Sequence, residues 1–161
     1  MVNTQNAFPE TRFRHCHNVG LKMYSYTKNV LKWNENRCKD MYLLGLFHDI
    51  GYEFNGDSFK HDEEMSEALF RNGYRYYLEI KYHSCIQDIY DSDEMRLLYF
   101  GDMTVDGTGH WCSFEERMYD LEKRHGKNSK EYIESERIVN KLIEWGFDDK
   151  LSLSFYISHI S

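Results

Sequence analysis

The chain has 161 residues, of which 41% are hydrophobic and 16% aromatic, so it carries enough apolar side chains for a folded core. Its length fits one domain spanning residues 1–161. The formal net charge of −7 gives no general attraction to nucleic acid or to an anionic membrane, and we expect neither as a partner. The single proline, Pro9, and the lack of dense glycine turns disfavour a many-stranded β fold and favour helices.

Cysteine spacing and the apolar runs indicate the compartment. The chain has four cysteines and no C-x-x-C pair, and its N-terminus lacks the charged and apolar regions of a secretory leader. No apolar run approaches the roughly 18–20 residues that a membrane span needs. We therefore expect free thiols in a reducing compartment and a cytoplasmic protein with no membrane anchor.

Apolar residues recur at three- and four-residue steps along the chain, which predicts helices. We expect the first six over about residues 11–33, 36–48, 58–72, 76–83, 92–106 and 113–124. Gly73 and Gly126 follow two of these segments and are natural helix terminators.

A further helix is expected to begin at Asn128 or Ser129, with Glu131 completing a capping box, and to end at Trp145. The tail from Leu151 alternates like a strand but also fits a helix, and its helical surroundings favour a helix. Together these segments predict an all-α bundle of about six to eight helices.

Each of the first five helices carries a possible metal ligand on its apolar stripe or at its end: His15, His48, His61, His83 and Asp102. Asp49 directly follows one of them. Any single histidine of this kind is more often a hydrogen-bonded core residue, and a lone aspartate can cap a helix or form an ion pair. Six such groups would each cost about 1–3 kcal/mol if buried without a partner. Their coincidence predicts a site for one or two divalent metal ions.

Imidazole and carboxylate ligands suit Mn, Fe, Co, Ni and Zn better than Ca, and Mg is a further candidate. Other polar residues are expected outside the site. His17 lies about 200° around the helix from His15, so both cannot easily bind one ion. His110 is expected in a solvated loop, and the acidic run 62–64 on the surface.

The order His15, His48-Asp49, Asp102 resembles the H…HD…D signature of the HD superfamily of metal-dependent phosphohydrolases. Residues 12–19 (RFRHCHNV) resemble the family's R-x-x-H-x-x-x-V start, and residues 43–51 (LLGLFHDIG) its apolar-HD-I-G turn. Residues 97–104 (LLYFGDMT) are similar to the helix with the last aspartate, where alanine is commoner than glycine before it. The similarity extends over residues 11–135, the motif-bearing core.

This resemblance implies a helical bundle that hydrolyses a phosphoester or phosphoanhydride with a metal-activated water. His61 and His83 lie between the His48-Asp49 pair and Asp102, and two extra histidines at this place resemble the dinuclear branch of the family. That branch implies one ion held by residues matching His15, His48, Asp49 and Asp102, and a second held by those matching His61 and His83, with Asp49 bridging. The open alternative is a single ion, with His61 and His83 contacting substrate phosphate.

Asp49 and His48 are the expected catalytic residues, and Asp49 is the best candidate for holding the attacking water. Arg12 and Arg117 are candidates for binding substrate phosphate, because guanidinium forks match phosphate oxygens. Either arginine can equally be a structural ion-pair residue.

The expected substrate is a small phosphorylated metabolite, with a nucleotide as the leading candidate. Bacterial HD-type diadenosine tetraphosphate hydrolases carry similar extra histidines, but this chain has residues 103–106 (MTVD) where charged residues tend to follow their last aspartate. Two other classes stay open: a di-iron HD-type oxygenase, and a metal-binding regulatory module without turnover. Retention of all six ligands argues against the module. Both a monomer and a homodimer are compatible with the sequence.

Overall fold

The computed structural model describes residues 10–53 and 60–150, excluding the side chains of residues 52, 53, 60 and 61. Its elements are α1 (Glu10–Asn29), α2 (Glu35–Phe47), the 3-10 helix η2 (Ile50–Glu53), α3 (Lys60–Arg71), α4 (Tyr77–Tyr82), α5 (Asp93–Asp102), α6 (Phe114–His125) and α7 (Lys130–Glu144). Over these ranges there is no strand, only an isolated bridge between Val105 and Trp111. The prediction of an all-α fold with six to eight helices is confirmed. The tail from Leu151 lies outside the described residues.

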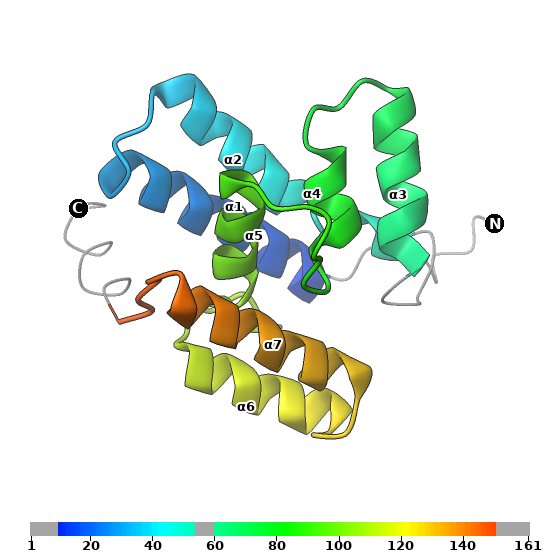
Figure 1. Cartoon of the computed structure of the whole chain (residues 1–161), viewed down its shortest axis with the longest axis vertical. Coiled ribbons are helices and arrows are strands. Elements are labelled where there is room, and N and C mark those ends of the chain that lie inside the picture. The colour runs from blue at the N-terminus through cyan, green and yellow to red at the C-terminus, as the bar shows by residue number, and fades with distance from the viewer. Residues whose placement is uncertain (1–9, 54–59, 151–161) are drawn as a thin grey trace.

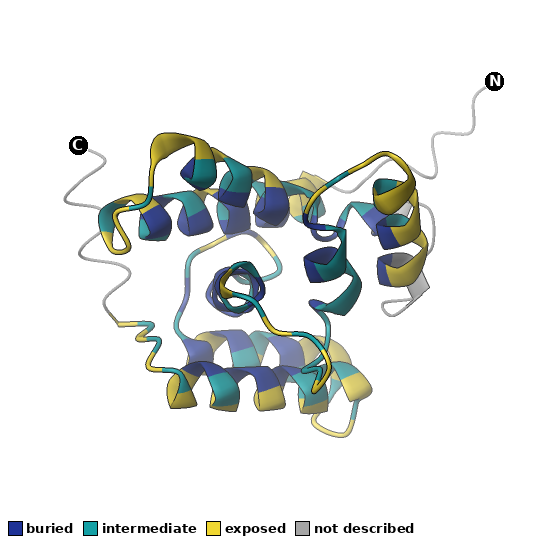
Figure 2. Cartoon of the chain, turned by 45° about the horizontal axis from the view of Figure 1, so that its top comes forward, coloured by how far each residue is buried: buried dark blue, intermediate teal, exposed yellow. Residues whose placement is uncertain are grey.

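Four of the helices form two antiparallel pairs with α5 between them, and α3 packs with α4 beside them (Figure 1). One pair is α1 with α2, and the other is α6 with α7. Viewed along its axis, α5 lies between the buried faces of both pairs (Figure 2). None of the helices in the described ranges is long and apolar enough to cross a membrane.

The central position of α5 follows from its composition. Its residues 97–101 are all buried, and they contribute to two separate apolar clusters. Leu98 packs with Val19 and Leu44 of the first pair, whereas Phe100 packs with Ile138 of the second. A helix that is apolar around most of its circumference is stable only when other elements cover it on several sides.

At the start of four α-helices, the side chain of the N-cap residue accepts a hydrogen bond from a backbone N–H of the first turn. Ser113 Oγ accepts from the Glu116 backbone N–H, and the Glu116 carboxylate accepts from the Ser113 N–H, which completes a capping box. At α7 the cap is Ser129, whose Oγ accepts from the N–H of Tyr132. Tyr132 is therefore the third helical residue, and the predicted capping box at Glu131 is wrong.

Two helices end earlier than their apolar periodicity predicts. After α1 the chain turns at Lys32, which has a φ of 56°. After α5 the Asp106 carboxylate accepts from the backbone N–H groups of Thr108 and His110, and this local turn competes with further helix. The helix that was expected to reach about residue 106 therefore ends at Asp102. The carboxylate of Asp102 thus lies at the end of α5.

Candidate metal centre

Two of the predicted ligands sit directly after helices and bond back to them. His48 follows α2, and its Nδ1 lies 2.6 Å from the carbonyl oxygen of Gly45. His83 follows α4, and its Nδ1 lies 2.7 Å from the carbonyl oxygen of Ile80. The last carbonyls of a helix lack intrahelical partners, so each ring satisfies one of them. A carbonyl oxygen can only accept, so Nδ1 carries the hydrogen and Nε2 points into the site.

His15 has the same arrangement with a different partner. It lies on α1, and its Nδ1 is 2.8 Å from the carbonyl oxygen of Asp106 in the turn after α5. Its Nε2 therefore also faces the site. Ligand histidines in proteins are oriented by this kind of bond from the nitrogen that does not bind the metal.

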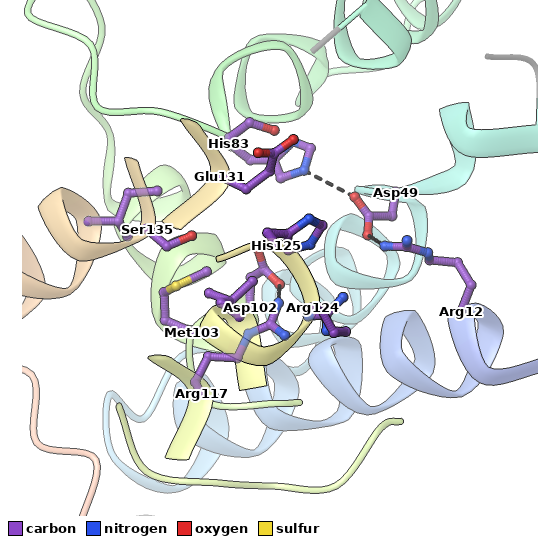
Figure 3. Close-up of a pocket in the computed structure, with 13 residues that line it drawn as sticks. Arg12, Asp49, His83, Asp102, Met103, Arg117, Arg124, His125, Glu131 and Ser135 are labelled. Atoms are coloured by element: carbon purple, nitrogen blue, oxygen red, sulfur yellow. Dashed lines mark hydrogen bonds and ion pairs between the residues drawn. The ribbon is translucent and has the colours of Figure 1, made fainter. Parts of the chain in front are cut away.

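The three Nε2 atoms converge on two carboxylates. His15 Nε2 lies 3.0 Å from Asp102 Oδ1, and His83 Nε2 lies 3.2 Å from Asp49 Oδ1. His48 Nε2 lies 3.6 Å from Asp49 Oδ2 and 3.8 Å from Asp102 Oδ1. The two oxygens of Asp49 thus face different histidines, and Figure 3 shows its carboxylate between His83 and Arg12.

His48 Nε2 is the strongest indication of a missing partner. The residue is fully buried, and this nitrogen has no hydrogen-bond partner among the described residues. A buried nitrogen without a partner costs free energy unless something binds it. One donor atom each from His15, His48 and Asp102 lies within 4.8 Å of the others. The donor types, the burial and the oriented rings fit a first-row divalent ion.

Two arginines pair with the two carboxylates. Arg12 Nη1 lies 2.7 Å from Asp49 Oδ2, and Arg117 Nη2 lies 3.2 Å from Asp102 Oδ1. Arg117 also reaches Asp120 Oδ2 at 2.9 Å. Arg12 and Arg117 therefore both lie at the centre as ion-pair residues, and their binding of substrate phosphate stays a prediction.

Burial and neighbouring charges shift the pKa of three residues at the site. Burial alone would raise the pKa of Asp102, but the hydrogen bond with His15 and the charge of Arg117 hold it well below its usual range. Burial lowers the pKa of His48. Burial would also lower the pKa of His83, but Asp62 and Asp49 raise it to about 10. Asp102 is therefore ionised at neutral pH.

The position of Asp62 contradicts the sequence-based prediction. It was expected on the surface with Glu63 and Glu64, and those two are exposed, but Asp62 is only 2% exposed. Its Oδ1 lies 3.7 Å from His83 Nδ1, and its carboxylate accepts a hydrogen bond from Ser84. Asp62 is the residue of this acidic run that lies on the buried face of α3. Three consecutive acidic residues do not indicate by themselves which one is buried.

Cys16 is a second residue at the centre that the sequence did not single out. Its thiol lies within 4.8 Å of one donor atom each from His48 and Asp49. Burial raises the pKa of the thiol, so the sulfur is protonated at neutral pH. In the sequence, the feature that could have pointed to Cys16 is its position directly after His15.

Two histidines that were expected outside the site lie outside it, and one predicted ligand histidine has a side chain outside the described residues. His17 turns away from the centre and its Nδ1 lies 2.9 Å from the hydroxyl of Tyr42. His110 is exposed in the loop after α5. The predicted ligand His61 is in the first turn of α3, but its side chain lies outside the described residues.

The centre opens into a pocket of about 230 Å³ between α5, α6 and α7 (Figure 3). Asp49, His83 and Asp102 reach it, and so do Arg124 and His125 near the end of α6. No family model matches the chain, and neither does any curated protein or solved structure. The function is therefore inferred from the chemistry of these residues.

Proposed function

We propose that this protein is a metal-dependent phosphohydrolase of the HD type. One observation carries the proposal: three imidazoles with oriented Nε2 atoms and two carboxylates converge on a buried point, and two guanidinium groups lie beside it. One pocket is lined by proposed metal ligands, Asp49, His83 and Asp102, and by both arginines proposed to bind phosphate. The substrate is a small phosphorylated metabolite, with a nucleotide as the leading candidate.

A divalent ion bound there would neutralise phosphoryl charge and lower the pKa of a bound water, so that hydroxide is available near neutral pH. His15, His48, Asp49 and Asp102 are the proposed ligands of one ion. The two directions of the Asp49 oxygens support a second ion on the His83 side, for which His61 is the further proposed ligand. Asp49 would then hold the attacking water by accepting its hydrogen bond.

The arginines have a defined role in this proposal. Without a metal, Arg12 and Arg117 neutralise Asp49 and Asp102. A cation held by the same carboxylates would compete with the guanidinium groups, which would then be available to phosphate oxygens. In a chain with a net charge of −7, such local positive charge is what an anionic substrate requires.

The guanidinium groups favour phosphate chemistry over the two other classes. Oxygen uptake by the iron-loaded protein, with a mixed-valent iron signal, would reveal the di-iron oxygenase. Stoichiometric metal binding without turnover of any phosphate ester would reveal the regulatory module.

The decisive experiment is a phosphate-release assay with Mn²⁺-reconstituted protein on a panel of nucleotides and phosphate esters. Wild type, Asp49→Ala and Asp102→Ala are compared for turnover and for bound metal. We expect turnover in the wild type and loss of turnover with weakened metal binding in both variants. Equal turnover in all three proteins, with metal retained, would reject the proposed centre.

A further inference from the structure

A second hollow lies beside the metal centre, and its lining is basic. It has a volume of about 230 Å³ and is formed by six residues: Thr11, Arg12, His15, Gly107, Arg117 and Arg124. Three of the six are arginines and none is a carboxylate, although the whole chain is acidic. We refer to it as the arginine hollow.

One carboxylate outside the lining holds two of these arginines in place. Asp120 accepts from Arg124 Nε at 3.1 Å and from Arg124 Nη2 at 2.8 Å, and it also accepts from Arg117 Nη1 at 2.9 Å. The same carboxylate accepts from the backbone N–H of Gly107 at 3.1 Å, which ties the loop after α5 to α6. The two guanidinium groups are thus positioned before any ligand arrives.

The backbone leaves room for the Arg124 guanidinium. A Cβ atom on Gly107 would lie 3.0 Å from Arg124 Cζ and 3.2 Å from its Nε and Nη2. These separations are tighter than ordinary carbon contacts, so the absence of a side chain at Gly107 allows the guanidinium to lie against the loop.

Arg117 retains a donor that its carboxylate partners do not use. Arg117 is 6% exposed, and its Nε has no hydrogen-bond partner among the described residues. A guanidinium carries more N–H donors than one carboxylate can accept, and its fork matches phosphate oxygens. Thr11 lies in the first turn of α1 and also lines the hollow. Backbone N–H groups in the first turn of a helix lack intrahelical partners.

The arginine hollow adjoins the pocket of the metal centre. Arg12, Arg117 and Arg124 line both spaces, and the pocket of the metal centre is also lined by Asp49 and Asp102. In Figure 3, Arg117 and Arg124 of α6 lie near Asp102, and Arg12 of α1 meets Asp49. A phosphate at the metal centre and a second one in the hollow would contact the same guanidinium groups.

We propose that the arginine hollow binds a second phosphate group of the substrate. The substrate then carries at least two linked phosphates, as a nucleoside diphosphate or triphosphate does, with one phosphorus at the metal centre and the next in the hollow. This inference rests on the proposed phosphohydrolase function and specifies its substrate class. Arg124 is the residue that distinguishes such substrates from monophosphates.

Binding of two non-hydrolysable probes to Mn²⁺-loaded protein tests this assignment. Methylenediphosphonate represents two linked phosphates and methylphosphonate represents one. Isothermal titration measures the ratio of their dissociation constants in wild type, Arg124→Gln and Arg124→Lys. Arg96→Gln is the matched control, because Arg96 also binds an aspartate through Nε and Nη2 and has similar exposure (34% against 37%).

We expect the wild type to prefer the diphosphonate. Arg124→Gln should reduce that preference by about tenfold, because a hydrogen bond to a charged group is lost. Arg124→Lys should retain part of it, and Arg96→Gln all of it. An unchanged preference in Arg124→Gln, or an equal loss in Arg96→Gln, would overturn the inference. Circular dichroism of each variant checks that the helices remain folded.

These outcomes separate the inference from the proposed function. Hydrolysis of nucleotides by a protein whose diphosphonate preference does not depend on Arg124 would reject the hollow and keep the phosphohydrolase. An Arg124-dependent diphosphonate preference in a protein that hydrolyses nothing would keep the hollow as a diphosphate site and reject the hydrolase.

Discussion

Gly20 and Gly45 meet backbone to backbone where α1 crosses α2. A Cβ atom on Gly45 would lie 2.6 Å from both the Cα and the N of Gly20, which is closer than non-bonded atoms approach. This contact lies five residues after His15 and three residues before His48. The close approach of α1 and α2 at these glycines therefore brings the imidazoles of His15 and His48 close together.

Gly45→Ala should force α1 and α2 apart. Because the obstructing atoms are backbone, we expect the free energy of unfolding to fall by about 1–3 kcal/mol. Metal affinity should fall too, since His15 and His48 separate. Urea denaturation and metal titration measure the two effects. Leu43→Ala, at an exposed position of the same helix, is the control and should leave metal affinity unchanged.

His15→Ala should weaken metal binding far more than His17→Ala. Both residues lie on α1, but only His15 points its Nε2 at Asp102, whereas His17 bonds Tyr42. Competition with a chelating dye gives the metal affinity of each variant. Similar affinities in the two variants would show that α1 contributes no ligand at this position.

The wild type should bind more than one equivalent of first-row metal, and His83→Ala should bind about one fewer. The reason is that His83 faces the oxygen of Asp49 opposite to the one that faces His48. Elemental analysis after reconstitution measures the count. At most one ion in the wild type would leave His61 and His83 as candidates for contacting substrate phosphate.

Arg117→Gln should retain metal and mainly raise KM, because loss of a phosphate contact weakens substrate binding without removing a ligand. It should also destabilise the metal-free protein by about 3–5 kcal/mol, since Arg117 is a buried partner of two carboxylates. Metal should offset part of that loss by neutralising Asp102. Thermal unfolding with and without Mn²⁺ checks this, and a loss of equal size in both states would contradict it.

Lys22 should make stability depend on pH. It is fully buried, its Nζ lies 3.3 Å from the Thr104 carbonyl oxygen, and burial lowers its pKa to about 8. The unfolded chain binds this proton up to the ordinary pKa of 10.5, so the charged form costs the fold about 3 kcal/mol below pH 8. That cost declines as pH rises from 8 to 10.5.

Lys22→Met should therefore unfold at a higher temperature than the wild type at pH 7, with the difference shrinking by pH 10. Groups common to both proteins cancel in the comparison. A difference that stays constant over this range would mean that Lys22 titrates normally in the folded protein.

Much of the fold and part of the centre could be predicted from local patterns. The three- and four-residue apolar spacing predicted the helices, because each helix must bury one face. The His48-Asp49 pair after an apolar run pointed to a buried polar site, because unpartnered polar groups are costly in a core. The ends of α1 and α5 were missed, since turns such as that at Asp106 depend on a few side-chain bonds.

The sequence by itself therefore determined the helical class and the inward placement of His15, His48, His83 and Asp102. Only the tertiary structure decided that Asp62 turns inward beside His83, that Asp120 holds Arg117 and Arg124 together, and that the arginine hollow adjoins the centre. Which side chains meet across helices depends on how closely and at what points the helices cross. Those crossings arise from contacts between residues far apart in the chain, such as Gly20 with Gly45, which no local periodicity encodes.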